Sequence, residues 1–329
     1  MFGLGTFSDG QRDFPGVVVD QSGVIDVSEW FGSVLEILQC WELSLDKLEK
    51  LAGLHRDDTI ELSELCVLPP VRPSQIIQSG ANYHKHVVDL IIDQQIGRRP
   101  EQTDKEFRAE VLKRMEERVA SGEPYMFLGA DSALVGANDD IELPARGKQH
   151  DWELELVAVI GRGGRHIPEE RALDHVAGYT IANDLTTRDL SRRSDLSAIG
   201  MVGMDWLRSK NAPTFLPVGP WIVPARFVAD PMNLEIVLQL NGETMQDDCT
   251  SDMVFGVPRL VSYASSLVDL RAGDLILTGS PAGNGTHYGR FLRPGDVIDA
   301  SIAGLGRHHN RCVESSKTPA EQTLDEQFS

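Results

Sequence analysis

Residues 151–161 read DWELELVAVIG. The apolar run from Leu156 to Ile160 predicts a buried strand, and Gly161 ends it. Side chains two positions apart point to the same face of a strand, so Glu153 and Glu155 share a face at its head. Two carboxylates against a buried sheet are stable only if one takes up a proton or if a cation neutralises the pair.

A third carboxylate, Asp184, follows the predicted strand VAGYTIAN at residues 176–183. Three carboxylates completed by water molecules suit a hard octahedral cation such as Mg²⁺ or Mn²⁺. The alternative is that Glu153 and Glu155 line the solvent face of an edge strand, where an E-x-E pattern is common. Spacing alone leaves both interpretations open.

A second polar group lies in GANYHKHVVD, residues 80–89. If the chain after Tyr83 is helical, His86 and Asp89 share one helix face at three residues apart. A carboxylate in this position can fix the imidazole tautomer and leave the other ring nitrogen free to accept a proton from water. The alternative is a pair of solvated polar residues at the start of a helix.

The amino-terminal part of the chain predicts a small α/β module over residues 1–70. Residues 16–27, GVVVDQSGVIDV, predict a β-hairpin around a Gln-Ser-Gly turn. Residues 33–51 carry apolar side chains mostly every three or four positions, which predicts one helix. Residues 103–120 predict an amphipathic helix that Gly122 ends.

From Leu143 onward, short apolar runs separated by Gly and Pro predict a mainly antiparallel β domain. Asn241-Gly242 is a strong hairpin signal within it. We interpret GRGGRH at residues 161–166 as a hairpin turn, because its last position lacks the glycine of a dinucleotide-binding loop. His308 and His309 face opposite ways on a strand, which favours surface positions over a metal site.

The composition excludes several classes of partner. The chain has 329 residues, a length typical of about two domains. Its 31 basic and 50 acidic residues give a net charge of −19, which disfavours binding to nucleic acid or to anionic membrane surfaces. Its four cysteines form no CxxC pair, so we expect neither a zinc ribbon nor a disulfide framework. We also expect a cytoplasmic location, because no signal peptide and no apolar run of about 20 residues is found.

Taken in order, these segments resemble the fumarylacetoacetate hydrolase family over residues 73–313. The landmarks of the resemblance are GANYHKHVVD, PYMFLGADSALVG, DWELELVAVIGRGGRHI, GYTIANDLTTRDL, SKNAPTFLPVGPWIV, LNGETMQ, DLILTGSPAGNG and LRPGDVIDASIAGLG. The fold that it implies is α+β and predominantly β. A mixed β-roll catalytic domain over residues 71–315 would follow the α/β module, and residues 316–329 would form a polar tail.

The resemblance also implies roles for particular residues. Glu153, Glu155 and Asp184 look like ligands of Mg²⁺ or Mn²⁺, with Ca²⁺ as a further candidate. His86 and Asp89 look like the pair that activates water, and Lys210 like a catalytic lysine. The remaining residues that the resemblance implies are substrate contacts, namely Arg188, Thr278 and Tyr83.

The activity that the resemblance implies is hydrolytic cleavage of a carbon–carbon bond in a 1,3-dicarbonyl acid, such as an acylpyruvate, by a homodimer. Decarboxylation of a 2-oxo acid of the oxaloacetate type and isomerisation of an enol acid are alternatives within the family. A metal-binding homologue without catalysis is the alternative outside the enzymes.

The sequence departs from the family pattern at three places. The predicted dyad has Asp89 where small decarboxylase members commonly have Glu, and Asn82 stands where the founding hydrolases have a fourth carboxylate. We therefore expect three carboxylate ligands. The segment from about residue 90 to residue 124 is longer than in the smallest members, and we expect it to form a helical lid over the dyad.

Overall fold

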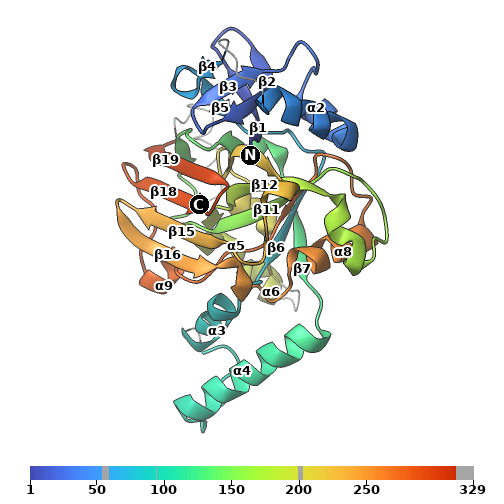
Figure 1. Cartoon of the computed structure of the whole chain (residues 1–329). Helices are drawn as coiled ribbons and strands as arrows, with labels where there is room; N and C mark the ends of the chain where they lie inside the picture. The colour runs from blue at the N-terminus through green and yellow to red at the C-terminus, as the bar shows by residue number, and fades with distance from the viewer. Residues whose placement is uncertain (54–58, 94, 199–202, 316–329) are drawn as a thin grey trace.

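The computed structural model describes residues 1–53, 59–93, 95–198 and 203–315. As predicted, these residues form an α+β structure that is mainly β (Figure 1). The strands are β1 (Gly3–Ser8), β2 (Asp13–Val19), β3 (Gly23–Asp26), β4 (Ile60–Glu61), β5 (Cys66–Leu68), β6 (Ile76–Gly80), β7 (Tyr125–Gly129), β8 (Leu134–Gly136), β9 (Ile141–Leu143), β10 (His150–Asp151), β11 (Leu154–Ile160), β12 (Val176–Asn183), β13 (Thr186–Thr187), β14 (Leu216–Pro224), β15 (Glu235–Leu240), β16 (Glu243–Cys249), β17 (Leu275–Leu277), β18 (Val297–Ile302) and β19 (Gly306–Glu314). The α-helices are α1 (Val34–Gln39), α2 (Trp41–Gly53), α3 (His84–Asp93), α4 (Asp104–Ser121), α5 (Arg188–Ser191), α6 (Ser194–Ala198), α7 (Trp206–Lys210), α8 (Val257–Leu267) and α9 (Gly285–Tyr288).

The strand β11 lies inside a large sheet, which has twelve strands in the described part of the chain. Its order runs β4-β3-β2-β1-β14-β12-β11-β17-β6-β7, with β5 beside β1 and β8 beside β14. All seven residues of β11 are buried because the sheet is covered on both faces. Leu154 and Leu156 belong to one hydrophobic cluster, whereas Val157 and Val159 belong to another. Glu153 and Glu155 therefore continue the row of side chains that includes Val157.

The amino-terminal strands extend this same sheet. β1 pairs with β14 through Leu4 and Ile222, and the predicted hairpin is confirmed as β2 and β3, with Val18 opposite Val24. The single helix predicted over residues 33–51 is wrong: it is two helices, because the Cys40 N–H turns back to Ile37 O and ends α1. The division into a module of residues 1–70 and a catalytic domain of residues 71–315 stays a prediction.

A second sheet packs beside the first in the order β16-β15-β18-β19-β9. The predicted hairpin at Asn241-Gly242 is confirmed between β15 and β16, with φ values of 54° and 81° that a two-residue turn of this kind requires. His309 is exposed as predicted, but the surface position predicted for His308 is wrong. His308 is buried under β14, where its Nε2 contacts Gly219 O at 2.9 Å.

The connection between β11 and β12 also differs from the prediction. The two strands pair in antiparallel fashion, but residues 161–175 join them and include a 3-10 helix at Glu169–His175. The predicted tight turn at residues 161–166 is therefore wrong, because the chain first crosses to Leu270 before it returns.

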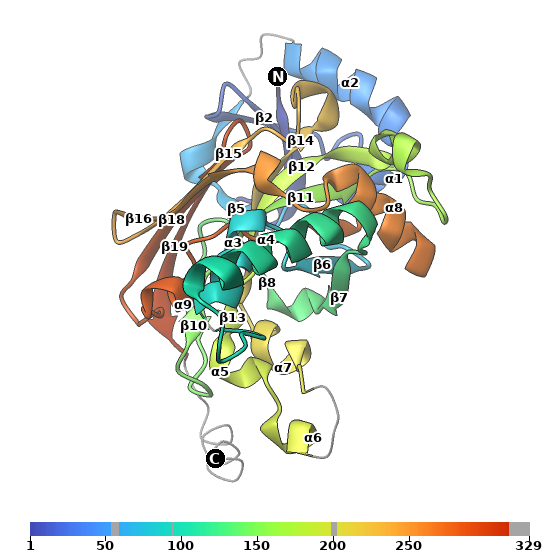
Figure 2. The same ribbon diagram turned by 90° about the horizontal axis from the view of Figure 1, so that it is seen from below.

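The helices α3 and α4 lie at the end of the molecule opposite the amino-terminal strands (Figures 1 and 2). The predicted helix of residues 103–120 is confirmed as α4. Thr103 and Glu106 form a capping box at its start, and Gly122 caps its end. Phe107, Val111 and Met115 are buried and join the hydrophobic cluster that contains α3 residues.

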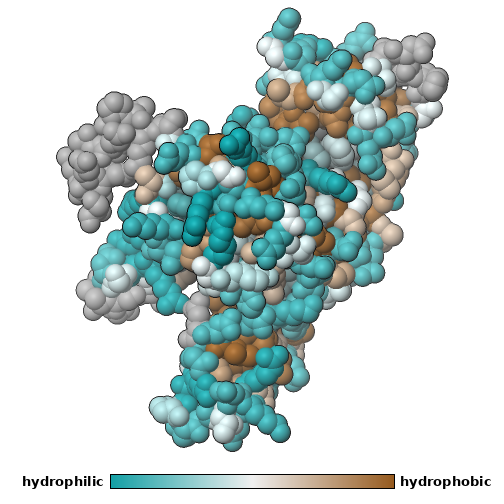
Figure 3. Space-filling model, turned by 90° about the vertical axis from the view of Figure 1, so that its left-hand side faces the viewer, coloured by the Kyte–Doolittle hydropathy of each residue, from teal (hydrophilic) through white to brown (hydrophobic). Residues whose placement is uncertain are grey.

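The face that carries β15, β16, β18 and β19 is mostly hydrophilic, with smaller hydrophobic areas (Figure 3). Among the described residues, no helix is both long enough and apolar enough to cross a bilayer. The polar tail predicted for residues 316–329 lies outside the described residues.

Candidate metal centre and active site

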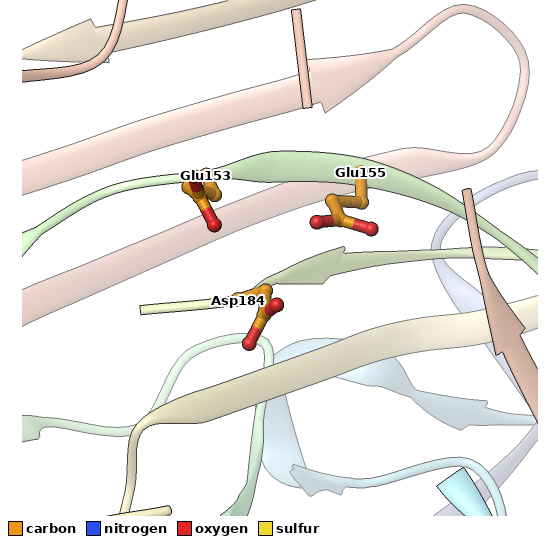
Figure 4. Close-up of side chains that lie close together, drawn as sticks. All are labelled: Glu153, Glu155 and Asp184. Carbon is orange, nitrogen blue, oxygen red and sulfur yellow. The ribbon is translucent and has the colours of Figure 1, made fainter. Parts of the chain in front are cut away.

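Three buried carboxylates converge at the ends of β11 and β12 (Figure 4). Leu154 lies opposite Asn183 in the antiparallel register, so the residues just beyond them, Glu153 and Asp184, are also neighbours. One oxygen from each of Glu153, Glu155 and Asp184 lies within 4.8 Å of the others. The alternative of a solvent-facing edge strand is wrong, since β11 pairs with β12 and β17 and the three residues are at most 8% exposed.

Lys210 bridges two of these carboxylates. Its Nζ lies 2.6 Å from Glu153 Oε2 and 2.6 Å from Asp184 Oδ2, and it donates a third bond of 2.7 Å to Thr186 Oγ1. An ammonium group has three N–H donors, so these three short bonds use all of them. In this arrangement Lys210 holds the carboxylates, and its role as a catalytic lysine stays a prediction.

Arg188 joins the carboxylate group to a fourth acid, Asp151. Its Nη2 donates to Glu153 Oε1 at 2.6 Å, and its Nε donates to Asp151 Oδ2 at 2.8 Å. Asp151 is fully buried and also accepts bonds from the backbone N–H groups of Gly285 and Thr286. Asp151 thus fixes both the guanidinium of Arg188 and the start of α9.

Two further oxygens of the triad also accept hydrogen bonds. Gln78 Nε2 donates to Asp184 Oδ1 at 2.6 Å, and the Gly279 N–H donates to Glu155 Oε2 at 2.7 Å. Thr278, a predicted substrate contact, is buried, and its hydroxyl donates to Leu156 O at 2.9 Å. These donors orient the carboxylates in advance, as outer contacts do around protein metal sites.

Asn82 has a structural role in place of the fourth carboxylate. Its Nδ2 donates to Phe255 O and Thr278 O at 2.9 and 2.8 Å, and its Oδ1 accepts from the Phe255 N–H at 2.9 Å. It ties the segment before α3 to the loop that carries Thr278.

The electrostatics of the triad fit a divalent cation. Burial and the charge of Asp184 raise the pKa of Glu155 well above its usual range, and burial raises the pKa of Asp184 to about 6. Burial also opposes ionisation of Glu153, but Arg188 and Lys210 outweigh it and keep the pKa of Glu153 low. Lys210 and Arg188 together carry two positive charges against the four acids Asp151, Glu153, Glu155 and Asp184. The buried site therefore carries more acids than basic groups, and an excess of carboxylate oxygens suits Mg²⁺ or Mn²⁺.

His86 and Asp89 line a cavity of about 210 Å³ between α3 and the loop of residues 282–287. They lie on one helix face as predicted, but no hydrogen bond between them is found in the described residues. Burial lowers the pKa of His86, while the charge of Glu153 opposes the shift. The imidazole is therefore neutral near pH 7 and able to accept a proton. The cavity wall is linked to the triad through two residues: Thr286 donates to Asp151, and Arg188 joins Asp151 to Glu153.

Tyr83 and the segment of residues 90–124 complete the predicted site. Tyr83 is fully buried, and its hydroxyl has no hydrogen-bond partner among the described residues. Burial and the charge of Glu155 raise the pKa of Tyr83 well above its usual range. In the segment of residues 90–124, Leu90 and Asp93 of α3 line the cavity and no α4 residue does, so a lid function of α4 stays a prediction.

The sequence analysis missed Asp151 and Gln78. A signal for Asp151 was present, because it stands two positions before Glu153 and continues the same alternation. Gln78 gave no signal, since it has no charge, belongs to no motif and meets Asp184 only through the sheet order.

Comparison with known proteins now identifies the family. The family profile described as fumarylacetoacetate (FAA) hydrolase, C-terminal, matches residues 75–313. The mitochondrial oxaloacetate tautomerase FAHD2A of Bos taurus is 34% identical over 298 residues, covering 88% of this chain and 84% of that protein. The human FAHD2A protein, also described as a mitochondrial oxaloacetate tautomerase, is 36% identical over 254 residues, covering 76% of this chain and 70% of that protein.

Two solved structures share the fold over nearly the whole chain. Fumarylacetoacetate hydrolase from Exiguobacterium antarcticum has a TM-score of 0.73 and 29% identity, covering 96% of this chain and 100% of that one. Maleylpyruvate hydrolase from Sphingobium sp. SYK-6, solved with manganese(II) and pyruvate, has a TM-score of 0.72, 28% identity and the same coverage. The profile match, the sequence relatives and the shared fold show that this chain belongs to the fumarylacetoacetate hydrolase family.

Proposed function

We propose that this chain is a divalent-metal-dependent enzyme that interconverts the enol and keto forms of a small 2-oxo dicarboxylic acid of the oxaloacetate type. The observation that carries the proposal is the buried carboxylate triad together with the neutral His86, which lines a cavity and is close enough to Glu153 for its charge to act on the imidazole. The oxaloacetate tautomerases that resemble the chain over 88% and 76% of its length support the choice of reaction.

Glu153, Glu155 and Asp184 are the residues that would hold the cation. A bound Mg²⁺ or Mn²⁺ would polarise the 2-oxo group and stabilise negative charge on its oxygen. The manganese in the maleylpyruvate hydrolase structure supports a cation of this kind, and the choice between Mg²⁺, Mn²⁺ and Ca²⁺ belongs to the proposal.

The protein side chains would bind the anion and move the proton. Arg188 uses two of its five N–H donors on Asp151 and Glu153, and its side chain is 21% exposed, so further donors remain for a substrate carboxylate. His86 accepts the enol O–H proton and returns a proton to the substrate carbon, so the imidazole is neutral again at the end of the reaction. Atoms and charge are conserved, so the mass of the substrate is unchanged.

The proposal is tested on the purified chain after dialysis against a chelator. Enol oxaloacetate is added with Mg²⁺, with Mn²⁺ or without metal, and the loss of enol absorbance is followed while mass spectrometry records the products. We expect metal-dependent acceleration with no change of mass. Full activity without metal would eliminate the metal-dependent reaction, and metal binding without turnover of any dicarbonyl acid would favour the non-catalytic alternative.

Hydrolysis of a 1,3-dicarbonyl acid is the second candidate. The presence of both His86 and Asp89 in one cavity wall favours it, because a carboxylate beside an imidazole supports water activation. The fold shared with maleylpyruvate hydrolase agrees with this reaction. Asp89→Asn separates the candidates: we expect hydrolysis of an acylpyruvate to fall about 100-fold, and tautomerisation to change much less.

Assembly and location remain part of the proposal. The family resemblance predicts a homodimer, which sedimentation of the purified chain would test. A cytoplasmic location stays a prediction. The two oxaloacetate tautomerases compared above are described as mitochondrial.

A further inference from the structure

Gln78 is a buried polar side chain on β6, the strand next to the β7 edge of the large sheet. It lies on β6 opposite Phe127 of β7, and only 2% of its surface is exposed. Its Nε2 donates to Asp184 Oδ1 at 2.6 Å, although 106 positions separate the two residues in the chain. Lys210 holds the other oxygen of Asp184, so both oxygens of this carboxylate have a fixed donor.

The orientation of the Gln78 amide follows from what a carboxylate can do. Ionised Asp184 only accepts hydrogen bonds, so the amide must present its NH₂ group to it. As a result, Gln78 Oε1 is buried with no hydrogen-bond partner among the described residues. A buried acceptor without a donor is destabilising. The bond to Asp184 is therefore the contact that keeps this side chain in the sheet.

Gly129 of β7 provides the space for the amide. A Cβ atom at this position would lie 2.9 Å from Gln78 Oε1 and 3.1 Å from Gln78 Cδ. The first distance is shorter than real Cβ contacts and the second is tighter than most of them, so an alanine here would shift the amide. Gly129 itself contacts none of the three carboxylates through a hydrogen bond in the described residues.

We propose that Gln78 is a positioning residue of the metal centre and that Gly129 is its steric partner. Gln78 holds Asp184 in the orientation needed for a cation. This inference rests on the metal site of the proposed function and deepens it. It does not depend on which substrate the enzyme takes.

A double-mutant cycle read out by metal affinity tests the inference. The full chain is stripped with a chelator, and Mn²⁺ binding is measured by calorimetry without substrate for the wild type, Gln78→Ala, Gly129→Ala and the double variant. We expect Gln78→Ala to weaken Mn²⁺ binding by about 10- to 100-fold. Gly129→Ala should also weaken it, but should add nothing in the Gln78→Ala background, because the displaced group is then absent.

Gln75→Ala is the matched control. Gln75 Nε2 donates to Asp274 Oδ2 at 2.8 Å, which is the same amide-to-carboxylate bond at a carboxylate outside the triad. We expect this variant to bind Mn²⁺ like the wild type. Circular dichroism and thermal melting of every variant establish that folding is retained.

The outcomes separate this inference from the proposed function. A folded Gln78→Ala variant with wild-type Mn²⁺ affinity, or a Gly129→Ala effect that is fully additive, would overturn the positioning role. A wild-type chain that binds no Mn²⁺ would overturn the metal centre and this inference together. Tight Mn²⁺ binding with the expected cycle but no tautomerisation would contradict only the proposed function.

Discussion

The Lys210 ammonium lies 2.6 Å from Glu153 Oε2, and both groups are buried. Burial alone would lower the pKa of Lys210, but the charges of Asp184 and Glu153 outweigh it and raise the pKa. The lysine therefore stays charged and compensates part of the negative charge of the triad. Phe127 and Trp206 rings lie 5.8 and 5.7 Å from the ammonium and add cation–π contacts.

Replacing Lys210 by Met should destabilise the metal-free protein, because the carboxylates lose a buried counter-charge. We expect a loss of about 3 kcal/mol in the free energy of unfolding, measured by urea titration in the presence of a chelator. The control is Lys85→Met, since Lys85 pairs with Asp248 but is 60% exposed and its loss should cost less than about 1 kcal/mol. Equal stability of the two variants would contradict the bridging role of Lys210.

Replacing Glu155 by Gln should weaken metal binding without destabilising the metal-free protein. The change removes a predicted ligand, so Mn²⁺ binding should weaken by at least about tenfold. It also removes an acid whose ionisation is opposed by burial and by the charge of Asp184, so the metal-free variant should unfold no more easily than the wild type at pH 8. Calorimetry and urea unfolding measure the two effects, and unchanged Mn²⁺ affinity would exclude Glu155 as a ligand.

Replacing Asp151 by Asn should disturb the site without removing a predicted ligand. Asp151 holds the Arg188 guanidinium and the backbone of Gly285, and a neutral amide cannot accept all of these bonds. We expect KM for the dicarboxylic acid to rise about tenfold, because the Arg188 guanidinium loses one of the two carboxylates that hold it in place. Steady-state kinetics at saturating Mn²⁺ provide the measurement, and an unchanged KM would argue against this link.

His308 should make stability depend on pH. Burial lowers its pKa to about 4 in the folded protein, against about 6.5 in an unfolded chain. The unfolded state therefore takes up the proton first as the pH falls. The contribution to stability is complete above pH 6.5 and is lost progressively down to pH 4, by up to about 3 kcal/mol.

His308→Gln isolates this contribution, because glutamine keeps a donor for Gly219 O and does not titrate. Urea unfolding from pH 7.5 to pH 4.5 should show a smaller loss of stability for this variant than for the wild type. His309→Gln is the matched control, since its side chain is 66% exposed. A wild type and a His308→Gln variant with parallel pH profiles would contradict the prediction.

The local pattern of residues was sufficient for the strand DWELELVAVIG, for the length of α4 and its end at Gly122, and for the Asn241-Gly242 turn. Each depends on neighbours a few positions apart, and side-chain periodicity, caps and turn dihedrals are local properties. The same alternation placed Glu153 and Glu155 on one face. The resemblance to the family added the convergence of Asp184, which the strand register then explained.

The tertiary structure alone showed what surrounds the triad. Lys210 reaches Glu153 across 57 positions and Gln78 reaches Asp184 across 106, because the sheet brings β6, β11 and β12 together out of chain order. The spacing of residues in the sequence does not predict these long-range contacts. The same long-range packing buried His308 against Gly219 and left His86 without a hydrogen bond to Asp89 in the described residues. Which strands become neighbours, and which charged side chains meet between them, depends on long-range packing of the whole chain.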